Sequence, residues 1–567
     1  MNFINSFFKQ NISLLLLLVV VVVLLGKQLN PFSPQIFLFH DVTQAARITE
    51  FKYAFLSGQI LPRIAPHFSF NLGYPIFTFY APGAYIISNI FSLFNFSPPD
   101  VIQVSFLASI LVGLIGAYFF LKKYFSEQAS LLGAAIYITS LYVPLSIFVR
   151  GNLAESWLIA LLPWGFYSLL PVEKITSRGS ILRVIVLTLL LTSHNGLSLF
   201  VGFYLLLFLV VTQASKKQWI IFTLGFFGSF YFYLPFILES SLTWAKTVAL
   251  KTNINDHFLC VKQLWSGDWG FGGSAPGCLN DGMSFKVGKI HLGLLTTSAI
   301  AFFWHLSIKR DDKKLIANLT VFFIFVTMFL LFMTTGLSKL IWNQIEFLKL
   351  MQYSWRLLAI AGIGFAWAGA FSIEYLPKQY KTILSYSLIA ITLMITSKYF
   401  YGQKILKSQF AHEYLSRDYI STKAAYQAPE YLPKTVNYDY WRSFEPTDNQ
   451  SNLPIFSQPA EITGGKYEII KNNPFQKIIK VQPQDQLTIN IHYLSSWKIV
   501  VNDKQFIPDK KNLDDLGRPF LSITEPSIIQ IYYKQTSIQM LGIFSLIMSV
   551  IIAGWLPVLT YAKRKRN

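Results

Sequence analysis

Residues Leu14–Leu25 read LLLLLVVVVVLL, and the polar pair His40-Asp41 follows shortly afterwards. An apolar run of this kind predicts a helix that enters a lipid bilayer. The segment after the run, Gly26–Asn30, shows no small-x-small cleavage site, so we expect an uncleaved first span. A carboxylate placed where lipid ends and water begins costs desolvation energy and usually has a function. Asp41 therefore indicates an active face at a membrane surface.

The composition places most of this chain in lipid. The chain has 567 residues, of which 53% are hydrophobic and 13% are charged, and its mean hydropathy is +0.44. Soluble domains carry about 25% charged residues. The net charge is +20, but the basic residues fall in short runs between apolar stretches, as in cytoplasmic loops. We therefore expect membrane lipids, and not nucleic acid, as partners.

Runs of about 20 apolar residues predict about twelve membrane spans. The predicted ranges are 10–29, 101–121, 128–149, 155–171, 182–193, 196–212, 218–237, 290–308, 315–334, 357–376, 382–398 and 537–560. The span 182–193 is too short to cross without a bend or local thinning of the bilayer. We interpret 80–96, which is rich in aromatic residues, as an interfacial segment because a further span there would invert the charge pattern.

The positive-inside rule orients these spans. With both termini in the cytoplasm, almost every short basic cluster falls on one side: Lys122-Lys123, Lys174 with Arg178 and Arg183, Lys216-Lys217, Lys309-Arg310 with Lys313-Lys314, Lys378 with Lys381, and Lys563–Arg566. The outer side then receives four long pieces: 30–100, 238–289, 335–356 and 399–536. This asymmetry places the function outside the cytoplasm.

The chain divides into three predicted parts. Residues 1–398 form the transmembrane domain with its long outer loops, 399–536 an extracytoplasmic domain, and 537–567 a final span with a basic cytoplasmic tail. The second half of 399–536 alternates apolar and polar residues in short runs, which predicts a small antiparallel β-sandwich. The sequence Val501-Asn502-Asp503-Lys504 is typical of a hairpin turn.

The sequence allows three interpretations of the role of Asp41. A helix over Asp41–Phe55 would place Asp41 near Thr43, Gln44 and Arg47. Its carboxylate is a candidate general base for an acceptor hydroxyl, oriented by His40. It is also a candidate ligand for Mg or Mn, which would neutralise a leaving phosphate. Finally, Asp is a good N-cap, so Asp41 could simply begin the following helix.

Several further polar residues are candidates to bind a donor phosphate or sugar, and each has a structural alternative. A guanidinium matches phosphate oxygens, but Arg63 could reach toward the interface from an aromatic belt, Arg150 could pair with Glu155, and Arg356 could anchor the chain at the interface. His194 and Asn195 lie between apolar runs and could line a cavity or satisfy backbone groups. The full candidate list is Arg47, Arg63, Arg150, Glu155, His194, Asn195, Trp269, Trp355 and Arg356.

The outer loop 255–293 carries aromatic residues and glycines, among them Trp269. Such residues suit a sugar face, and they also suit a lid packed on the bilayer. Cys260 and Cys278 are expected to form a disulfide outside the cytoplasm, with two reduced thiols as the alternative. The sequence has no CxxC motif and no Cys/His cluster, so a structural zinc site is not expected.

The segments Phe39–Asp41 through Arg63, Gly73–Pro82 and Arg150–Glu155 resemble the bacterial and archaeal membrane family called 6-pyruvoyl-tetrahydropterin synthase-related. The later segments Gln263–Trp265, Trp269–Gly272, Asp281–Phe285, Gln352–Arg356 and Ser496–Lys504 are similar to the same family and to its YfhO-like relatives. The resemblance covers most of the chain. The sequence lacks the zinc-binding His set that a soluble pterin synthase needs.

The resemblance instead implies a GT-C fold glycosyltransferase, which uses a lipid-linked sugar phosphate and an acidic residue in the first outer loop. Asp41 takes that role. Many relatives carry a His about one turn later, where this chain has Ala45.

Together these features predict an α-helical polytopic membrane protein of GT-C type with a C-terminal extracytoplasmic β-sandwich. The expected reaction moves a sugar from a polyprenyl-phosphate donor to a cell-envelope glycan, lipid or protein. A lipid or polysaccharide transporter and a non-catalytic envelope assembly protein are the alternatives. Asp and Glu are almost absent from the predicted spans, which favours the enzyme over a transporter.

Overall fold

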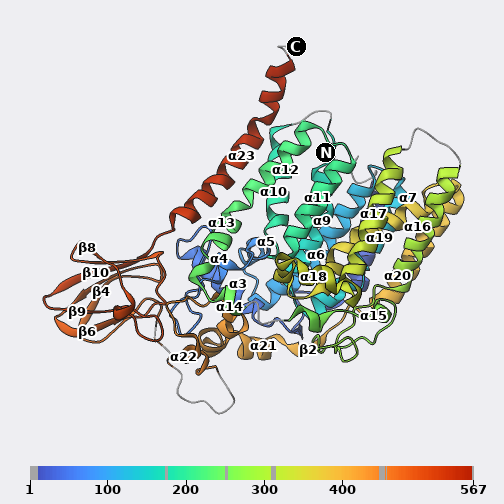
Figure 1. The fold of residues 1–567 in the computed structure, drawn as a ribbon. Coiled ribbons are helices and arrows are strands. Elements are labelled where there is room, and N and C mark those ends of the chain that lie inside the picture. The colour runs from blue at the N-terminus through green and yellow to red at the C-terminus, as the bar shows by residue number, and fades with distance from the viewer. Residues whose placement is uncertain are drawn as a thin grey trace.

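The computed structural model describes residues 11–172, 176–248, 253–307, 314–445, 454, 456 and 458–564. Several residues assigned to cytoplasmic segments lie outside this part of the chain: Lys174, Lys309, Arg310, Lys313, Lys565 and Arg566. Figure 1 shows a bundle of helices lying side by side, with the β-strands gathered beside one end of it. Both marked ends of the chain lie at the other end of the bundle.

The predicted apolar ranges all contain helix. Two of the helices begin at a capping box, Ser97 with Asp100 before α6 and Ser215 with Gln218 before α12, which satisfies backbone N–H groups of the first turn. The main helices are α2 (Ile12–Leu25), α6 (Pro98–Leu121), α7 (Glu127–Ile138), α9 (Leu153–Ser168), α10 (Ser177–Leu191), α11 (Leu197–Val211), α12 (Lys216–Gly228), α13 (Phe230–Leu238), α16 (Lys289–Ser307), α17 (Lys314–Thr334), α19 (Leu358–Glu374), α20 (Lys378–Ser397) and α23 (Ser537–Arg564).

Five of the described helices are long and apolar enough to cross a membrane: Pro98–Leu121, Lys314–Thr334, Ser354–Glu374, Lys378–Ser397 and Ser537–Val558. Two helix pairs, bent by 41° and 50°, raise the number to seven if each pair is one span. The helices α2, α10 and α11 have 14, 15 and 15 residues, which is shorter than the roughly 20 residues that a span needs. The chain thus has the helices of an integral membrane protein, and the count of twelve stays a prediction.

The segment 30–100, which the sequence predicts to lie outside the cytoplasm, folds back on the bundle. It contains β1 (Gln35–Leu38), α3 (Gln44–Leu56), α4 (Ile76–Phe79) and α5 (Gly83–Ser92). α5 has ten residues and is too short to cross a bilayer. β1 pairs antiparallel with β2 (Gln403–Leu406), so the first outer piece is joined to the segment that follows α20.

The C-terminal strands form two antiparallel sheets that share one apolar core. The order of the larger sheet is β4 (Tyr467–Asn473), β5 (Gln476–Val481), β10 (Ser527–Tyr533), β7 (Trp497–Val501) and β8 (Lys504–Phe506), and that of the smaller is β3 (Ile462–Thr463), β6 (Gln484–Ile489) and β9 (Phe520–Ile523). The predicted hairpin is confirmed: Val501 pairs with Lys504, and Asn502 and Asp503 have φ of 46° and 63°, as a tight hairpin turn requires.

The segment between α20 and the strands gave no periodicity in the sequence. In the structure it forms short helices, α21 (Lys407–Tyr414) and α22 (Tyr438–Arg442), with several helical turns between them. Buried apolar side chains such as Phe410 and Leu432 join this segment to the core of the helical bundle. Short turns of this kind carry no long period, which is why the pattern was not visible in the sequence.

Candidate active site

Asp41 lies directly beside the end of a bent helix pair. Its backbone N–H donates to the carbonyl of Arg150 at 3.0 Å, and the N–H of His40 donates to Val149 at 3.0 Å. Gly151 makes this approach feasible because its φ is +64° and a Cβ there would lie 2.0 Å from the Phe39 ring. Two distant parts of the sequence, the first outer piece and the start of α9, therefore meet at Asp41.

The carboxylate of Asp41 bonds to side chains of the α3 start. Gln44 Nε2 donates to Oδ2 at 2.6 Å, Thr43 Oγ1 donates to Oδ1 at 3.3 Å, and Arg47 Nη1 lies 3.9 Å from Oδ1. The cap position of α3 belongs to Thr43, not to Asp41. The Asp41 side chain is 29% exposed while that of Arg47 is 3% exposed, so the carboxylate is the accessible member of the pair.

Arg47 is held between two tyrosines of the neighbouring segment. Its Nη1 donates to Tyr85 Oη at 3.3 Å, and its guanidinium carbon lies 4.9 Å from the centre of the Tyr80 ring. Tyr85 Oη in turn donates to Gln44 Oε1 at 2.8 Å. Burial, followed by the nearby Asp41 carboxylate, raises the pKa of Tyr80 to about 12. Tyr80 therefore stays a neutral hydroxyl beside the carboxylate.

A second charged group surrounds Glu155, whose side chain is fully buried at the start of α9. Arg150 Nη1 forms an ion pair with Oε2, and Tyr142 Oη donates to the same oxygen at 2.7 Å. Arg356 Nε lies 3.3 Å and His194 Nε2 lies 3.7 Å from Oε1. The structural alternative for Arg150, pairing with Glu155, is thus present. Surface salt bridges contribute little to the free energy of unfolding, but this pair is buried, so that small contribution does not describe it.

Aromatic and amide side chains hold these groups in place. The guanidinium carbon of Arg150 lies 4.6 Å from the centre of the Trp355 ring. Asn195 Nδ2 donates to the carbonyl of Phe79 at 2.9 Å, and its Oδ1 accepts the Ala81 N–H at 2.7 Å. Asn195 therefore fixes the backbone on both sides of Tyr80.

The cluster around Asp41 and the cluster around Glu155 are close to each other. The pKa of Tyr80 is influenced by Asp41 and Arg47 from the first cluster and by Arg356 and Glu155 from the second. The three guanidinium groups of Arg47, Arg150 and Arg356 lie around the carboxylates of Asp41 and Glu155. This arrangement suits a ligand that carries or develops negative charge.

Three predicted site residues lie elsewhere. His40 Nε2 donates to the carbonyl of Phe271 at 2.8 Å, so its ring bonds to the loop 255–293 and does not orient Asp41. Arg63 is buried and donates to the carbonyl of Tyr231 on α13 at 2.7 Å. The Trp269 ring lies 5.1 Å from that of Tyr399. None of the three has an interaction with Asp41 or Glu155 in the described part of the chain.

Glu430 is a third carboxylate near the site, and the sequence analysis did not identify it. Burial raises its pKa, and Arg47 and Arg356 are both within electrostatic reach of it. Its neighbour Tyr431 lies with its hydroxyl 3.3 Å from Asn195 Nδ2. Pro429-Glu430-Tyr431 stands in the aperiodic segment after α20, so no sequence signal linked it to Asp41.

The donor set around Asp41 does not fit a divalent cation. Among the described residues, no group of three or more His, Cys, Asp or Glu side chains is arranged to hold a metal ion. The oxygens of Asp41 already accept from Gln44 and Thr43, and a guanidinium stands next to them.

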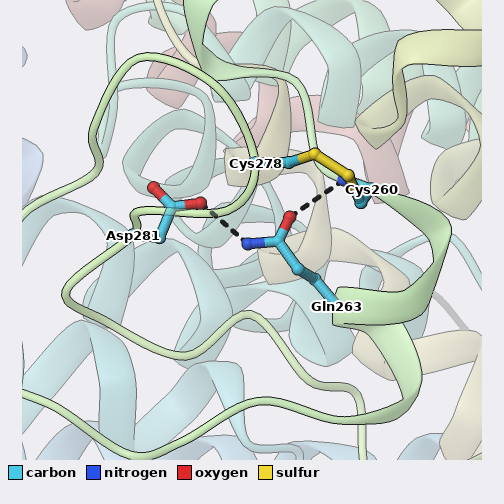
Figure 2. The surroundings of a disulfide bond; sticks show 4 residues. All are labelled: Cys260, Gln263, Cys278 and Asp281. Atoms are coloured by element: carbon cyan, nitrogen blue, oxygen red, sulfur yellow. Dashed lines mark hydrogen bonds between the residues drawn. A yellow bond between two sulfur atoms is a disulfide. The ribbon is translucent and has the colours of Figure 1, made fainter.

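A disulfide joins Cys260 and Cys278 in the loop 255–293, in which the Phe271 carbonyl accepts from His40. Figure 2 shows Gln263 between the bridge and Asp281: its Oε1 accepts the Cys260 N–H at 2.9 Å and its Nε2 donates to Asp281 Oδ2 at 2.8 Å. The same carboxylate accepts the Ala275 N–H at 2.9 Å. The bridge and this carboxylate together fix the loop beside the site.

No protein-family model and no curated protein matches this chain. Among solved structures, the chain is similar to the arabinofuranosyltransferase AftD from Mycobacteria, with 11% identity over 68% of this chain and 26% of that one and a TM-score of 0.45. It is also similar to the Archaeoglobus fulgidus oligosaccharyltransferase, with 11% identity over 79% and 61% of the chains and a TM-score of 0.42. The chain thus spans about a quarter of the AftD chain.

Proposed function

We propose that this chain is a membrane glycosyltransferase that moves a sugar from a polyprenyl-phosphate donor to a cell-envelope acceptor on the outer side of the membrane. The observation that carries the proposal is the partly exposed carboxylate of Asp41 beside the buried guanidinium of Arg47, with the groups of Arg150 and Arg356 close by. The resemblance to the pterin-synthase-related membrane family points to the same residue.

The proposed chemistry uses Asp41 as the general base. Its carboxylate takes the proton of an acceptor hydroxyl while that oxygen attacks the anomeric carbon of the donor sugar. The bond between the anomeric carbon and the phosphate oxygen breaks, and polyprenyl phosphate leaves with the bonding electron pair. The guanidinium groups of Arg47, Arg150 and Arg356 stabilise the charge that develops on the leaving phosphate. Gln44 and Thr43 hold the carboxylate in position through the two bonds described above.

The arrangement of the chain supports an outer-face site. Both chain ends lie at one end of the bundle and the strands beside the other (Figure 1). With the basic segments in the cytoplasm, Asp41 and the strand domain lie outside. The polyprenyl chain of the donor would then remain in the outer leaflet while its phosphate reaches the guanidinium groups.

The test is the loss of transfer in Asp41→Asn, which keeps the shape of the side chain and removes the base. In a strain deleted for this chain, complementation with wild type restores the envelope glycan measured by mass spectrometry. Asp41→Asn, at equal abundance in the membrane, lowers the transferred product by about 100-fold or more. The matched control is Asp268→Asn, an exposed carboxylate of the outer loop, which leaves the product unchanged. Full activity in Asp41→Asn removes Asp41 from the mechanism, and an unaltered glycan profile in the deletion strain favours a transporter or an assembly protein.

A further inference from the structure

A cleft of about 610 Å³ opens between α3, the turn at 67–71, the segment after α21 and the strand domain. Its position is fixed because Ala54 of α3 packs into the core of the strand domain and Asn473 Nδ2 donates to the carbonyl of Ser57 at 3.1 Å. Contacts on both sides therefore fix the cleft at the junction between the helices and the strands.

The floor of the cleft carries a bonded pair, Glu50 and His67. Glu50 Oε1 lies 2.8 Å from His67 Nδ1, and Oε2 accepts the backbone N–H of His67 at 2.8 Å. An ionised carboxylate only accepts hydrogen bonds, so Nδ1 donates to Glu50 and Nε2 is the ring atom that remains for a further hydrogen bond. The Glu50 side chain is 2% exposed and that of His67 is 29% exposed. No described residue bonds to His67 Nε2, so this ring atom is left for a ligand in the cleft.

An unused acceptor lies beside it. Asn71 lines the cleft and is buried, and its Oδ1 has no partner among the described residues, while its Nδ2 donates to the carbonyl of Phe456. Ser69, Phe70 and Asn71 have φ of 56°, 64° and 65°. Three successive residues in the left-handed region each cost roughly 1 kcal/mol or more. A turn with such backbone strain and an unpaired amide oxygen is typical of a binding site.

The cleft is close to the Asp41 site. Gln44, which bonds to Asp41, and Glu50 lie on the same helix, about 9 Å apart along its axis at 1.5 Å per residue. Tyr419 lies within electrostatic reach of both Asp41 and Arg47, and the next residue, Ile420, lines the cleft. The hydroxyl of Tyr419 is buried without a partner among the described residues. The cleft and the Asp41 site therefore lie close to each other.

The lining identifies the chemistry of the ligand. It combines an imidazole, the ring of Tyr53 and side-chain amides of Asn71, Gln458 and Asn472. Hydroxyl groups of a saccharide both donate and accept, and its C–H faces pack on an aromatic ring. A phosphate or sulfate would need several guanidinium groups, and Arg417 is the one arginine among the described lining residues.

We propose that this cleft binds a saccharide, which under the proposed function is the non-reacting part of the acceptor glycan. His67 Nε2 and the side-chain amides of Gln458 and Asn472 bond to sugar hydroxyls, and Tyr53 supplies the stacking face. Glu50 is a positioning residue that sets the tautomer and orientation of His67. The identification as an acceptor site rests on the proposed function, whereas saccharide binding itself does not.

The experiment measures binding without transfer. The full chain in lipid nanodiscs is titrated with short soluble oligosaccharides of hexose, N-acetylhexosamine, pentose and hexuronic acid, and binding is followed by ligand-observed NMR. His67→Ala and Tyr53→Ala each weaken the binding of the best oligosaccharide by about tenfold. Asn472→Ala changes an exposed side chain of the same cleft and provides a weakened variant if His67→Ala does not fold. His412→Ala, an exposed histidine outside the cleft, keeps wild-type affinity.

The outcomes separate this inference from the proposed function. Binding that is lost in His67→Ala and kept in Asp41→Asn supports the cleft, even if no transfer is found and the proposed function fails. No binding of any oligosaccharide, or equal binding in wild type, His67→Ala, Tyr53→Ala and Asn472→Ala, overturns it, even if Asp41→Asn abolishes transfer. Competition by inorganic phosphate at a concentration that saturates the cleft also overturns it, because the site then recognises an anion.

Discussion

Glu155 Oε1 lies 3.3 Å from Arg356 Nε, although the two residues stand on α9 and just before α19. Arg150 pairs with the other oxygen of the same carboxylate. One buried carboxylate thus holds two arginines that come from distant parts of the chain. This shared carboxylate places the guanidinium groups of Arg150 and Arg356 near Asp41, although both arginines are far from Asp41 in the sequence.

Replacing Glu155 with Ala is expected to destabilise the protein strongly. Arg150 and Arg356 would remain buried without their carboxylate, and removing one partner of a buried pair costs about 3–5 kcal/mol. The melting temperature of the purified protein in detergent, compared with wild type, measures the effect. Glu525→Ala, which removes an exposed carboxylate of the strand domain, is the matched control and leaves the melting temperature unchanged. Equal melting of Glu155→Ala and wild type would contradict the role of the buried pair.

Gly151→Ala is expected to disturb the contact between Asp41 and Arg150. The φ of Gly151 is +64°, and the new Cβ would lie 2.0 Å from Phe39. The backbone must therefore move, or the folded state is destabilised by a strain energy of about 1–3 kcal/mol. Both the melting temperature and the proposed transfer activity should fall. Gly273→Ala is the control, because a Cβ there meets nothing within 4 Å. A fall of equal size in both variants would show a general effect of alanine in these loops.

Local patterns predicted much of this fold. Apolar runs located the helices, and Val501-Asn502-Asp503-Lys504 located a hairpin that the pairing of β7 with β8 confirms. Arg150 and Glu155 are five residues apart, so their pairing could be foreseen as an alternative. Arg356 and His194 join them because each stands at a helix end on the same side of the bundle, which a topology with alternating spans implies.

Contacts between loops could not be predicted in the same way. Arg63 was a candidate for the phosphate, but its guanidinium is taken by the carbonyl of Tyr231. His40 is adjacent to Asp41 in sequence, yet its ring bonds to Phe271, 231 residues away. Glu430 reaches the site through a segment of short helical turns without a period. In each case the contact depends on how a long loop folds back on the bundle. Residue type and spacing do not predict that path.

The disulfide between Cys260 and Cys278 is expected to keep the outer loop closed. The cysteines are 18 residues apart, and a bridge closing a loop of this size stabilises it by about 3 kcal/mol in the chain-entropy account. Cys260→Ser with Cys278→Ser should therefore increase the rate of tryptic cleavage at the loop residues Lys262 and Lys286. Mass spectrometry of the fragments measures the rate. Reductant should have the same effect on wild type and none on the double variant, and resistance of the reduced protein would contradict the prediction.

Acidification should destabilise the junction between the helices and the strand domain through His492. Its Nε2 accepts from Ser69 Oγ at 2.7 Å and its Nδ1 donates to the carbonyl of Leu516 at 2.7 Å, while Trp441 Nε1 donates to the same Ser69 oxygen at 2.8 Å. Burial, with a contribution from Arg518, lowers the pKa of His492 to about 4 from an ordinary value of 6.5. The folded state therefore resists protonation that the unfolded state accepts.

The sign of the pH effect follows from this difference. Above pH 6.5 the histidine is neutral in both states and has no effect. As the pH falls from 6.5 to 4, the unfolded state binds a proton that the folded state does not, and the free energy of unfolding decreases by up to about 3 kcal/mol. His492→Gln, which keeps an acceptor and a donor but does not titrate, should be less stable than wild type at pH 7.5 and should approach it at pH 4.5. Thermal melting of both proteins across this range, with the exposed His412→Gln as the control that follows wild type, measures the effect. A constant difference between wild type and His492→Gln at all pH values would show that the histidine stabilises the junction only by its hydrogen bonds and packing.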